Sequence, residues 1–113
     1  SLGDAIQDQA EKVAIPKDLE MEHILTHKVV WSDIDTNGHV NNVKYAVWAL
    51  DAVKAEDIKE RPLKEILINF DAEVLPGDTV RISRVRQETE DGFVYYITGK
   101  VADKQNFAVK LVF

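Results

Sequence analysis

Cysteine is absent from this chain of 113 residues, and its absence rules out several kinds of site. Without thiols the chain has no disulfide, no zinc site built on cysteine and no cysteine nucleophile. Glycine occurs 5 times and proline 3 times, and no internal repeat or low-complexity stretch is present. The fold therefore has to rest on an ordinary packed core.

A basic excess and a long apolar run are also missing. The 14 Lys and Arg face 20 Asp and Glu, which gives a net charge of −6. This charge disfavours sequence-independent attraction to nucleic acid or anionic lipid, so an acidic protein partner would need a local basic patch. No apolar run approaches the roughly 20 residues of a membrane span. We expect neither nucleic-acid binding nor a membrane span, and a cytoplasmic location of the bacterial type, since no targeting segment opens the chain.

The composition that remains is typical of one folded domain. Hydrophobic residues make up 45% of the chain and charged residues 30%, which is globular usage at a length that suits a single core. The polar N-terminal segment is broken at Ile15-Pro16, because proline lacks an amide hydrogen and restricts the residue before it. We interpret residues 1–16 as a linker or lead-in and residues 17–113 as a single domain.

Periodicity predicts a strand and then a buried helix in the first half of the domain. β-branched and aromatic residues indicate a strand over residues 21–31, which ends in the polar turn 32–38. A row of apolar residues at helical spacing follows, and further apolar residues fill much of the remaining circumference. The row consists of Val40, Val43, Val47, Leu50 and Val53, and the further residues are Tyr45, Ala46, Trp48 and Ala49.

Four more strands are predicted after Arg61-Pro62, where the period changes to two. Residues 66–74 alternate between apolar and other side chains, as in a strand with one face on a core. Further strands are expected at 79–87, 93–101 and 107–113, joined by short turns. The order predicts an α+β fold in which an antiparallel sheet wraps around one long buried helix. Exposed edge strands favour a homodimer or pairing with a second, similar domain.

Residues 33–42 concentrate two carboxylates, three amides and an imidazole. Gly38 permits a tight turn from strand to helix, and the first turn of a helix offers free N–H groups to a developing oxyanion. In an extended path Asp35, Asn37 and His39 share one side. Taken singly, these residue types are ordinary turn and capping residues. As a run, they favour acyl transfer to water.

This run resembles the signature of a known enzyme family. Residues 35–45 read Asp-Thr-Asn-Gly-His-Val-Asn-Asn-Val-Lys-Tyr. They are similar to the Asp-x-Asn-x-His-Val-Asn-Asn-x-Lys-Tyr motif of acyl-acyl-carrier-protein thioesterases, which release free fatty acids. The resemblance implies a hotdog fold, here the C-terminal of two such domains, and a role in fatty acid biosynthesis. The implied partner is an acyl-carrier protein bearing a phosphopantetheine-linked acyl chain, and no cofactor is implied.

The same resemblance implies four catalytic side chains, Asp35, Asn37, His39 and Glu73. Asp35 would be the base or the direct nucleophile, and His39 would orient or deprotonate the water. Asn37 would position water or carbonyl, and Glu73 would be the second carboxylate. By alternation, however, Glu73 falls on the polar face of its strand, so its entry into the site requires a bulge before Pro76.

Backbone and substrate contacts complete the implied site. The backbone at Gly38 and Val40 would hold the thioester oxygen. The implied substrate-binding side chains are Asn41, Asn42, Lys44 and Tyr45. Val74 stands where many plant members of the family carry cysteine, which favours a mechanism based on water or a carboxylate. Basic residues that are candidates for contact with an acidic carrier are Lys44, Arg81, Arg84 and Arg86.

Two alternatives stay open from the sequence. Single-domain acyl-CoA thioesterases of the hotdog fold share a looser motif, Asp-x-x-Gly-His-Val-Asn-Asn, which also places the catalytic carboxylate at Asp35. The second alternative is a non-catalytic hotdog module for acyl binding or dimerisation.

We expect no metal site, because His23 and His27 lack partners at ligand spacing and Lys44 occupies the position where a calcium loop needs Glu.

Overall fold

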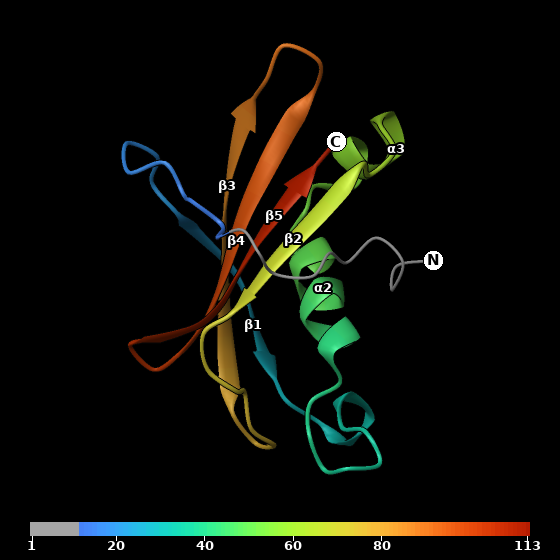
Figure 1. Ribbon diagram of the computed structural model, residues 1–113, viewed down its shortest axis with the longest axis vertical. Helices are drawn as coiled ribbons and strands as arrows, with labels where there is room; N and C mark the ends of the chain where they lie inside the picture. Colours follow the sequence, from blue (N-terminus) through green and yellow to red (C-terminus); the bar gives the residue numbers. More distant parts are fainter. Residues whose placement is uncertain (1–11) are drawn as a thin grey trace.

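The computed structural model describes residues 12–113 (Figure 1), so most of the predicted lead-in lies outside the described residues. The elements in chain order are β1 (Glu22–Lys28), the 3₁₀ helix η1 (Trp31–Asp33), α2 (Asn42–Asp51), α3 (Ala55–Glu60), β2 (Glu65–Phe70), β3 (Thr79–Glu88), β4 (Phe93–Val101) and β5 (Lys104–Val112). None of the helices in this part of the chain is long and apolar enough to cross a membrane.

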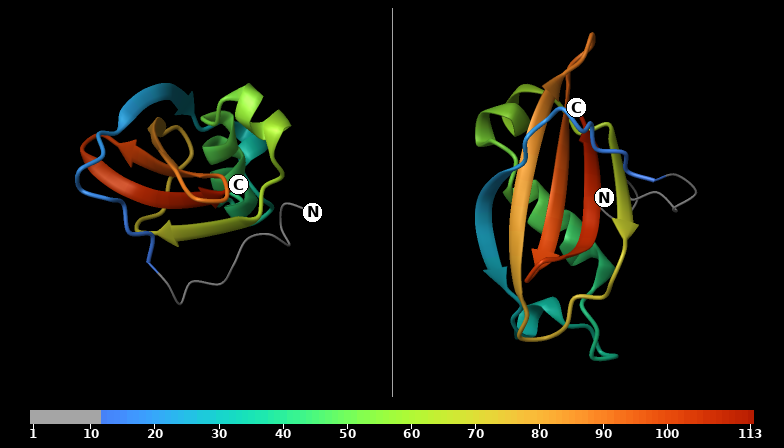
Figure 2. Two further views of the ribbon diagram at one scale, coloured as in Figure 1. Left: turned by 90° about the horizontal axis from the view of Figure 1, so that it is seen from above. Right: turned by 90° about the vertical axis from the view of Figure 1, so that its left-hand side faces the viewer.

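The five strands form one antiparallel sheet in the order β1-β3-β4-β5-β2. The sheet curves around α2, which lies on its concave face (Figure 2). This is the hotdog arrangement predicted from the sequence. The outer face is crossed by the segment that leads into β1 (Figure 2), and there the Val13 amide donates to Asn69 Oδ1 at 2.5 Å.

The buried helix is confirmed, but within α2 the buried residues are the further apolar residues and not those of the predicted row. The helix begins where Asn41 caps it, with Oδ1 accepting from the Val43 amide at 3.0 Å. Val43 is 37% exposed, whereas the alanines Ala46 and Ala49 are fully buried. Small side chains let the helix backbone approach the sheet, and the buried rings of Tyr45 and Trp48 both pack near the Phe107 ring of β5. The buried residues of α2 are Tyr45, Ala46, Trp48 and Ala49.

The first predicted strand is too long at its C-terminal end. β1 ends at Lys28, and η1 follows at once, leaving Trp31 89% exposed. The reason is the buried carboxylate of Asp33, whose Oδ2 accepts from the Val30 amide at 2.9 Å. This hydrogen bond turns the chain away from the sheet. Strand propensity alone did not predict it.

The helix α3 was not predicted, and buried polar contacts hold it to the sheet. Asp57 Oδ2 accepts from Arg86 Nε at 2.9 Å and from the Tyr95 hydroxyl. Burial raises the pKa of Asp57, but these two hydrogen bonds and the charges of Arg86 and Lys54 together outweigh it, so the net pKa is lowered. Arg84 Nη1 donates to Ala52 O at 2.7 Å. Two of the basic residues that were candidates for a carrier protein therefore stabilise the fold.

A glycine in β4 makes close packing of β5 possible. A Cβ atom on Gly99 would lie 2.1 Å from Cε1 of the buried Phe107 ring. We expect Gly99→Ala to lower the free energy of unfolding by roughly 1–3 kcal/mol through overpacking. Urea denaturation measures this, with Lys100→Ala on the exposed neighbour as the control. Equal stability of the two variants would contradict the packing account.

Candidate active site

The turn between β1 and α2 is closed by backbone hydrogen bonds. Ile34 and Val40 form an isolated antiparallel bridge, flanked by Asp35 N to His39 O at 2.8 Å and Asn41 N to Asp33 O at 3.0 Å. Gly38 takes the φ angle of 80° that this tight path needs. These hydrogen bonds therefore hold the backbone of residues 35–40 in one conformation immediately before α2.

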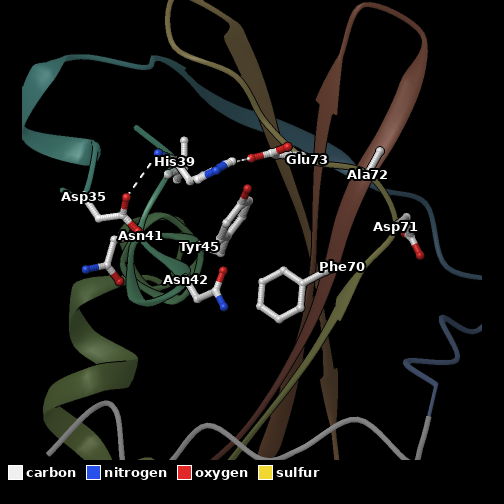
Figure 3. A pocket seen from close by; sticks show the side chains of 10 residues that line it. Asp35, His39, Asn41, Asn42, Tyr45, Phe70, Asp71, Ala72 and Glu73 are labelled. Atoms are coloured by element: carbon white, nitrogen blue, oxygen red, sulfur yellow. Dashed lines mark hydrogen bonds and ion pairs between the residues drawn. The ribbon is translucent and has the colours of Figure 1, made fainter. Parts of the chain in front are cut away.

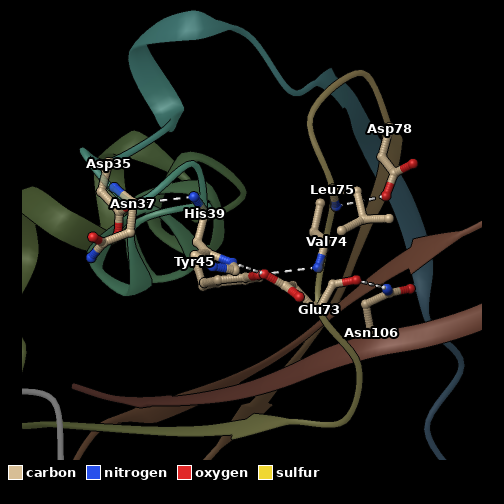
Figure 4. A network of polar contacts seen from close by, with 9 residues as sticks. All are labelled: Asp35, Asn37, His39, Tyr45, Glu73, Val74, Leu75, Asp78 and Asn106. Atoms are coloured by element: carbon tan, nitrogen blue, oxygen red, sulfur yellow. Dashed lines mark hydrogen bonds and ion pairs between the residues drawn. The ribbon is translucent and has the colours of Figure 1, made fainter.

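The carboxylate of Asp35 is held inside this turn. Its Oδ1 accepts from the Asn37 amide at 2.9 Å and from the His39 amide at 3.1 Å. Figure 4 shows Asp35 and Asn37 side by side at the turn, with His39 next to them. Among residues 12–113, Asp35 Oδ2 receives no hydrogen bond, so one oxygen shapes the turn and the other is available.

A buried carboxylate supports the turn from beneath. Asp33 is 3% exposed, and its Oδ2 accepts from His27 Nε2 at 2.8 Å as well as from Val30. Burial raises the pKa of Asp33, yet the hydrogen bonds from Val30 and His27 and the charges of His27 and Lys44 together outweigh it, so the net pKa is lowered. Lys44 Nζ lies 3.9 Å from Asp33 Oδ1. Lys44, an expected substrate contact, thus faces Asp33 and is not among the residues that line the cleft described below.

His39 and Glu73, which are far apart in sequence, meet in space. His39 Nδ1 donates to Glu73 Oε1 at 2.5 Å, and the two side chains are 61% and 49% exposed. The hydrogen bond and the charge of Glu73 raise the pKa of His39 above its ordinary 6.5, and the Asp35 carboxylate adds to the effect. Because Nδ1 is occupied, the second ring nitrogen, Nε2, remains available to a ligand.

Glu73 reaches His39 because its strand ends early. The predicted strand over 66–74 is wrong at its end, since β2 stops at Phe70 and residues 71–74 leave the ladder. The Val74 amide then donates to the hydroxyl of Tyr45 at 3.2 Å, and Val74 is fully buried. Because the strand ends at Phe70, the alternation of side chains between its two faces does not extend to Glu73. The direction of the Glu73 side chain is therefore not set by the strand pattern.

These groups line a cleft of about 780 Å³ between the turn, α2 and the segment after β2 (Figure 3). Its lining residues are Asp35, His39, Val40, Asn41, Asn42, Tyr45, Phe70, Asp71, Ala72 and Glu73. In Figure 3 the His39–Glu73 pair lies above the Tyr45 ring, and the Phe70 ring lies below, beside the Asn42 side chain. The cleft can therefore hold a ligand that has a polar reacting group and an apolar extension.

The remaining residues of the expected site are distributed unevenly around this cleft. Asn37 and Gly38 lie in the turn but not in the lining, and the Gly38 amide donates to Asp35 O at 3.1 Å. Asn41 lines the cleft and also caps α2. Sequence reasoning missed Phe70, Asp71 and Ala72 as wall residues. Only their position just before Glu73 could have indicated them.

Tyr45 has a structural place as well as a position in the cleft wall. It is 3% exposed, and its ring packs edge-on against Phe70 and Phe107 at centroid distances of 5.2 and 5.0 Å. Burial raises the pKa of Tyr45 above 10.0, so the hydroxyl is neutral and accepts from Val74. The hydroxyl links α2 to the segment that carries Glu73.

The arrangement suits acid-base chemistry at the end of the cleft. An imidazole held at Nδ1 by a carboxylate, with Nε2 available, can take a proton from water and return it to a leaving group. Within residues 12–113 no group of three or more His, Asp or Glu side chains is arranged to hold a metal ion. The chemistry that the described side chains offer is general acid-base catalysis beside a second carboxylate.

Comparisons with known proteins identify similar sequences and folds. Residues 16–113 match the family model of the acyl-ACP thioesterase C-terminal domain. Oleoyl-acyl carrier protein thioesterase 2, chloroplastic, of Arabidopsis thaliana is 37% identical over 68 residues, which are 60% of this chain and 18% of that protein. An acyl-ACP thioesterase from Bacteroides thetaiotaomicron VPI-5482 has a TM-score of 0.65 at 21% identity and matches 93% of this chain and 44% of its own.

A third similar protein belongs to another substrate class. The 1,4-dihydroxy-2-naphthoyl-CoA thioesterase from Synechocystis has a TM-score of 0.68 at 15% identity, covering 81% of this chain and 79% of its own. At such identities the two solved structures show the shared fold alone. The match spans less than half the length of the Arabidopsis and Bacteroides proteins.

The contact between His39 and Glu73 predicts how His39 titrates. We expect the pKa of His39, followed by NMR of its ring protons, to lie above 6.5 and to fall toward 6.5 in Glu73→Gln, because the ionised partner is lost. Glu90→Gln, in the exposed β3–β4 turn, is the matched control and should leave the titration unchanged. A His39 pKa that is the same in all three proteins would show that the contact does not form in solution.

The hydroxyl of Tyr45 predicts a cost in stability. Tyr45→Phe leaves the buried Val74 amide without its acceptor, so we expect the free energy of unfolding to drop by about 1–3 kcal/mol. Tyr96→Phe is the control, since the Tyr96 hydroxyl has no hydrogen bond within residues 12–113. Chemical denaturation compares the two. If both substitutions cost the same, the Tyr45 hydroxyl does not hold Val74.

Proposed function

Because the chain belongs to the family of acyl-ACP thioesterase C-terminal domains, we propose that it hydrolyses the thioester of fatty acyl-acyl-carrier protein and releases free fatty acid. The observation that carries this proposal is the hydrogen bond of 2.5 Å between His39 and Glu73 in the wall of the cleft. Residues 17–113 would form the catalytic domain of this enzyme.

In the proposed mechanism, His39 is the general base. A water molecule attacks the thioester carbonyl carbon while His39 Nε2 takes its proton, and Glu73 at Nδ1 stabilises the imidazolium that forms. The tetrahedral intermediate collapses, the carbon–sulfur bond breaks, and the thiolate takes the proton back from His39. The products are a fatty acid and the free thiol, and His39 returns to its neutral form.

The oxyanion of the intermediate would be held at the start of α2. In the Ile34–Val40 bridge the two hydrogen bonds flank the pair, so the Val40 amide points away from Ile34. It has no acceptor among residues 12–113, whereas the Gly38 amide already donates to Asp35 O. Val40 is therefore the backbone donor that we assign, aided by the positive end of the helix dipole.

Asp35 would act beside His39 in this scheme. Its Oδ1 is committed to two backbone amides, so Oδ2 is the oxygen that can orient the attacking water. Direct attack by Asp35 on the carbonyl is the alternative, and it would give a mixed anhydride. Trapping with hydroxylamine followed by mass spectrometry of the Asp35 peptide separates the two. Asn37 would only shape the turn, through the backbone N–H that it donates to Asp35 Oδ1.

The acyl-carrier protein is the proposed partner, and a second hotdog domain or a second copy is the proposed neighbour. The family match supports the carrier-protein substrate, and the chain spans less than half the length of the Arabidopsis and Bacteroides relatives. Phe70 in the cleft wall is 43% exposed and Val43 on α2 is 37% exposed. A second domain that covered these side chains would complete an apolar channel for the acyl chain.

The test is thiol release from matched acyl-carrier-protein and acyl-CoA substrates of several chain lengths. We expect hydrolysis of the carrier-protein substrates, with kcat/KM lowered by roughly 10²–10⁴-fold in His39→Ala, the range for loss of a general base. Activity should rise as His39 deprotonates, with an acid limb in kcat/KM above pH 6.5 because its pKa is raised.

The other outcomes identify the competing functions. Preference for CoA substrates would assign the chain to the acyl-CoA thioesterases. Full activity in His39→Ala would refute the proposed base, and Glu90→Gln provides the matched surface control. No turnover above the His39→Ala blank, with acyl binding retained, would identify a non-catalytic acyl-binding or dimerisation module.

A further inference from the structure

Asn106 is an extra residue in β5. Gly99 of β4 pairs with Phe107, and the next residue, Lys100, pairs with Gln105, so Asn106 has no partner in the β4–β5 ladder. This is a β-bulge, which bends a strand and redirects the side chain at the bulge. Asn106 is 4% exposed. A buried amide at such a position needs hydrogen bonds.

Three hydrogen bonds of Asn106 go to the segment that carries Glu73. The carbonyl oxygen of Asn106 accepts from the Asp71 amide at 2.8 Å and from the Ala72 amide at 3.0 Å. Its side-chain Nδ2 donates to the carbonyl oxygen of Glu73 at 3.3 Å, and Oδ1 accepts from the Val101 amide at 3.2 Å. Figure 4 shows the Asn106 side chain beside the Glu73 backbone.

These contacts explain why β2 ends where it does. The last pair of the β2–β5 ladder is Phe70 with Phe107, so a continued ladder would have placed Asp71 opposite Asn106. Instead two successive amides converge on one carbonyl oxygen, and the chain turns toward α2. On the far side of Glu73 the Tyr45 hydroxyl holds the Val74 amide. The backbone of Glu73 is thus fixed from both sides, although its side chain is half exposed.

We propose that Asn106 is a positioning residue of the active site, which acts through Glu73 by holding its backbone so that its carboxylate meets His39. The inference rests on the proposed function for its catalytic meaning. Asparagine suits the role because it carries a donor and an acceptor on one short side chain, and the two partners here require one of each.

The role predicts two effects of Asn106→Ala. His39 should lose its fixed partner, so its pKa, measured by NMR, should fall toward that of the Glu73→Gln protein. The other groups that line the cleft around His39, namely Asp35, Tyr45 and Asp71, are unchanged in this variant. In the thioesterase assay kcat should fall by roughly 10–100-fold, with KM nearly unchanged. This is the range for losing a hydrogen bond that orients a metal ligand, and we apply it here to a hydrogen bond that orients a catalytic side chain.

A smaller change and a neighbouring control separate positioning from folding. Asn106→Ser fills part of the space, but its hydroxyl is too short to reach both partners, so the same changes are expected to a lesser degree. Gln105→Ala removes the exposed hydrogen bond of 3.1 Å to the Asp71 carboxylate and should leave both the His39 pKa and kcat within error of the parent. Titrations are compared only for variants whose NMR spectra show the folded chain.

The result that overturns the proposal is an unchanged His39 pKa in a folded Asn106→Ser or Asn106→Ala protein, whatever happens to kcat. The titration needs no turnover. If the parent chain does not hydrolyse thioesters, the proposed function fails, and the His39 titration still decides whether Asn106 positions Glu73.

Discussion

The close packing of α2 against the concave face of the sheet is the interaction on which the rest of the structure depends. Ala46 and Ala49 are fully buried and bring the helix backbone close to the strands. α2 begins at Asn42, three residues after His39, and its Tyr45 hydroxyl accepts from the Val74 amide next to Glu73. If α2 packed at a different distance from the sheet, His39, which precedes the helix, would move relative to Glu73, which follows β2.

Local parts of the fold and site could be predicted from the sequence, and non-local parts could not. The turn with Asp35 and His39 is defined within a few residues by Gly38 and by hydrogen bonds between neighbours. Alternation could not give the orientation of Glu73, because the ladder ends at Phe70, where the next two amides donate to Asn106 of another strand. The sequence pattern suggested a bulge in the strand of Glu73, whereas the bulge lies in β5.

The carboxylates of this protein divide by their surroundings, which their sequence neighbours do not reveal. Asp33 and Asp57 are buried, and Oδ2 of each accepts two hydrogen bonds from other parts of the chain, so both fasten elements of the fold. Asp35 and Glu73 line the cleft, and each keeps an oxygen without a hydrogen-bond donor among residues 12–113. The sequence predicts Lys44 as a substrate contact. In the structure its Nζ lies 3.9 Å from the buried Asp33 carboxylate.

The contact between His39 and Glu73 joins residues 34 positions apart, and its geometry depends on a strand that comes later still in the chain. β5 comes last among the five strands of the sheet, so the support for Glu73 arrives only when β5 has joined the sheet. Contacts between residues so far apart in sequence form after local ones, because closing the loop between them costs chain entropy before the contacts contribute any stability. The pair is therefore a marker of the assembled five-stranded sheet, and a chain in which β5 has not joined the sheet would carry His39 without its partner.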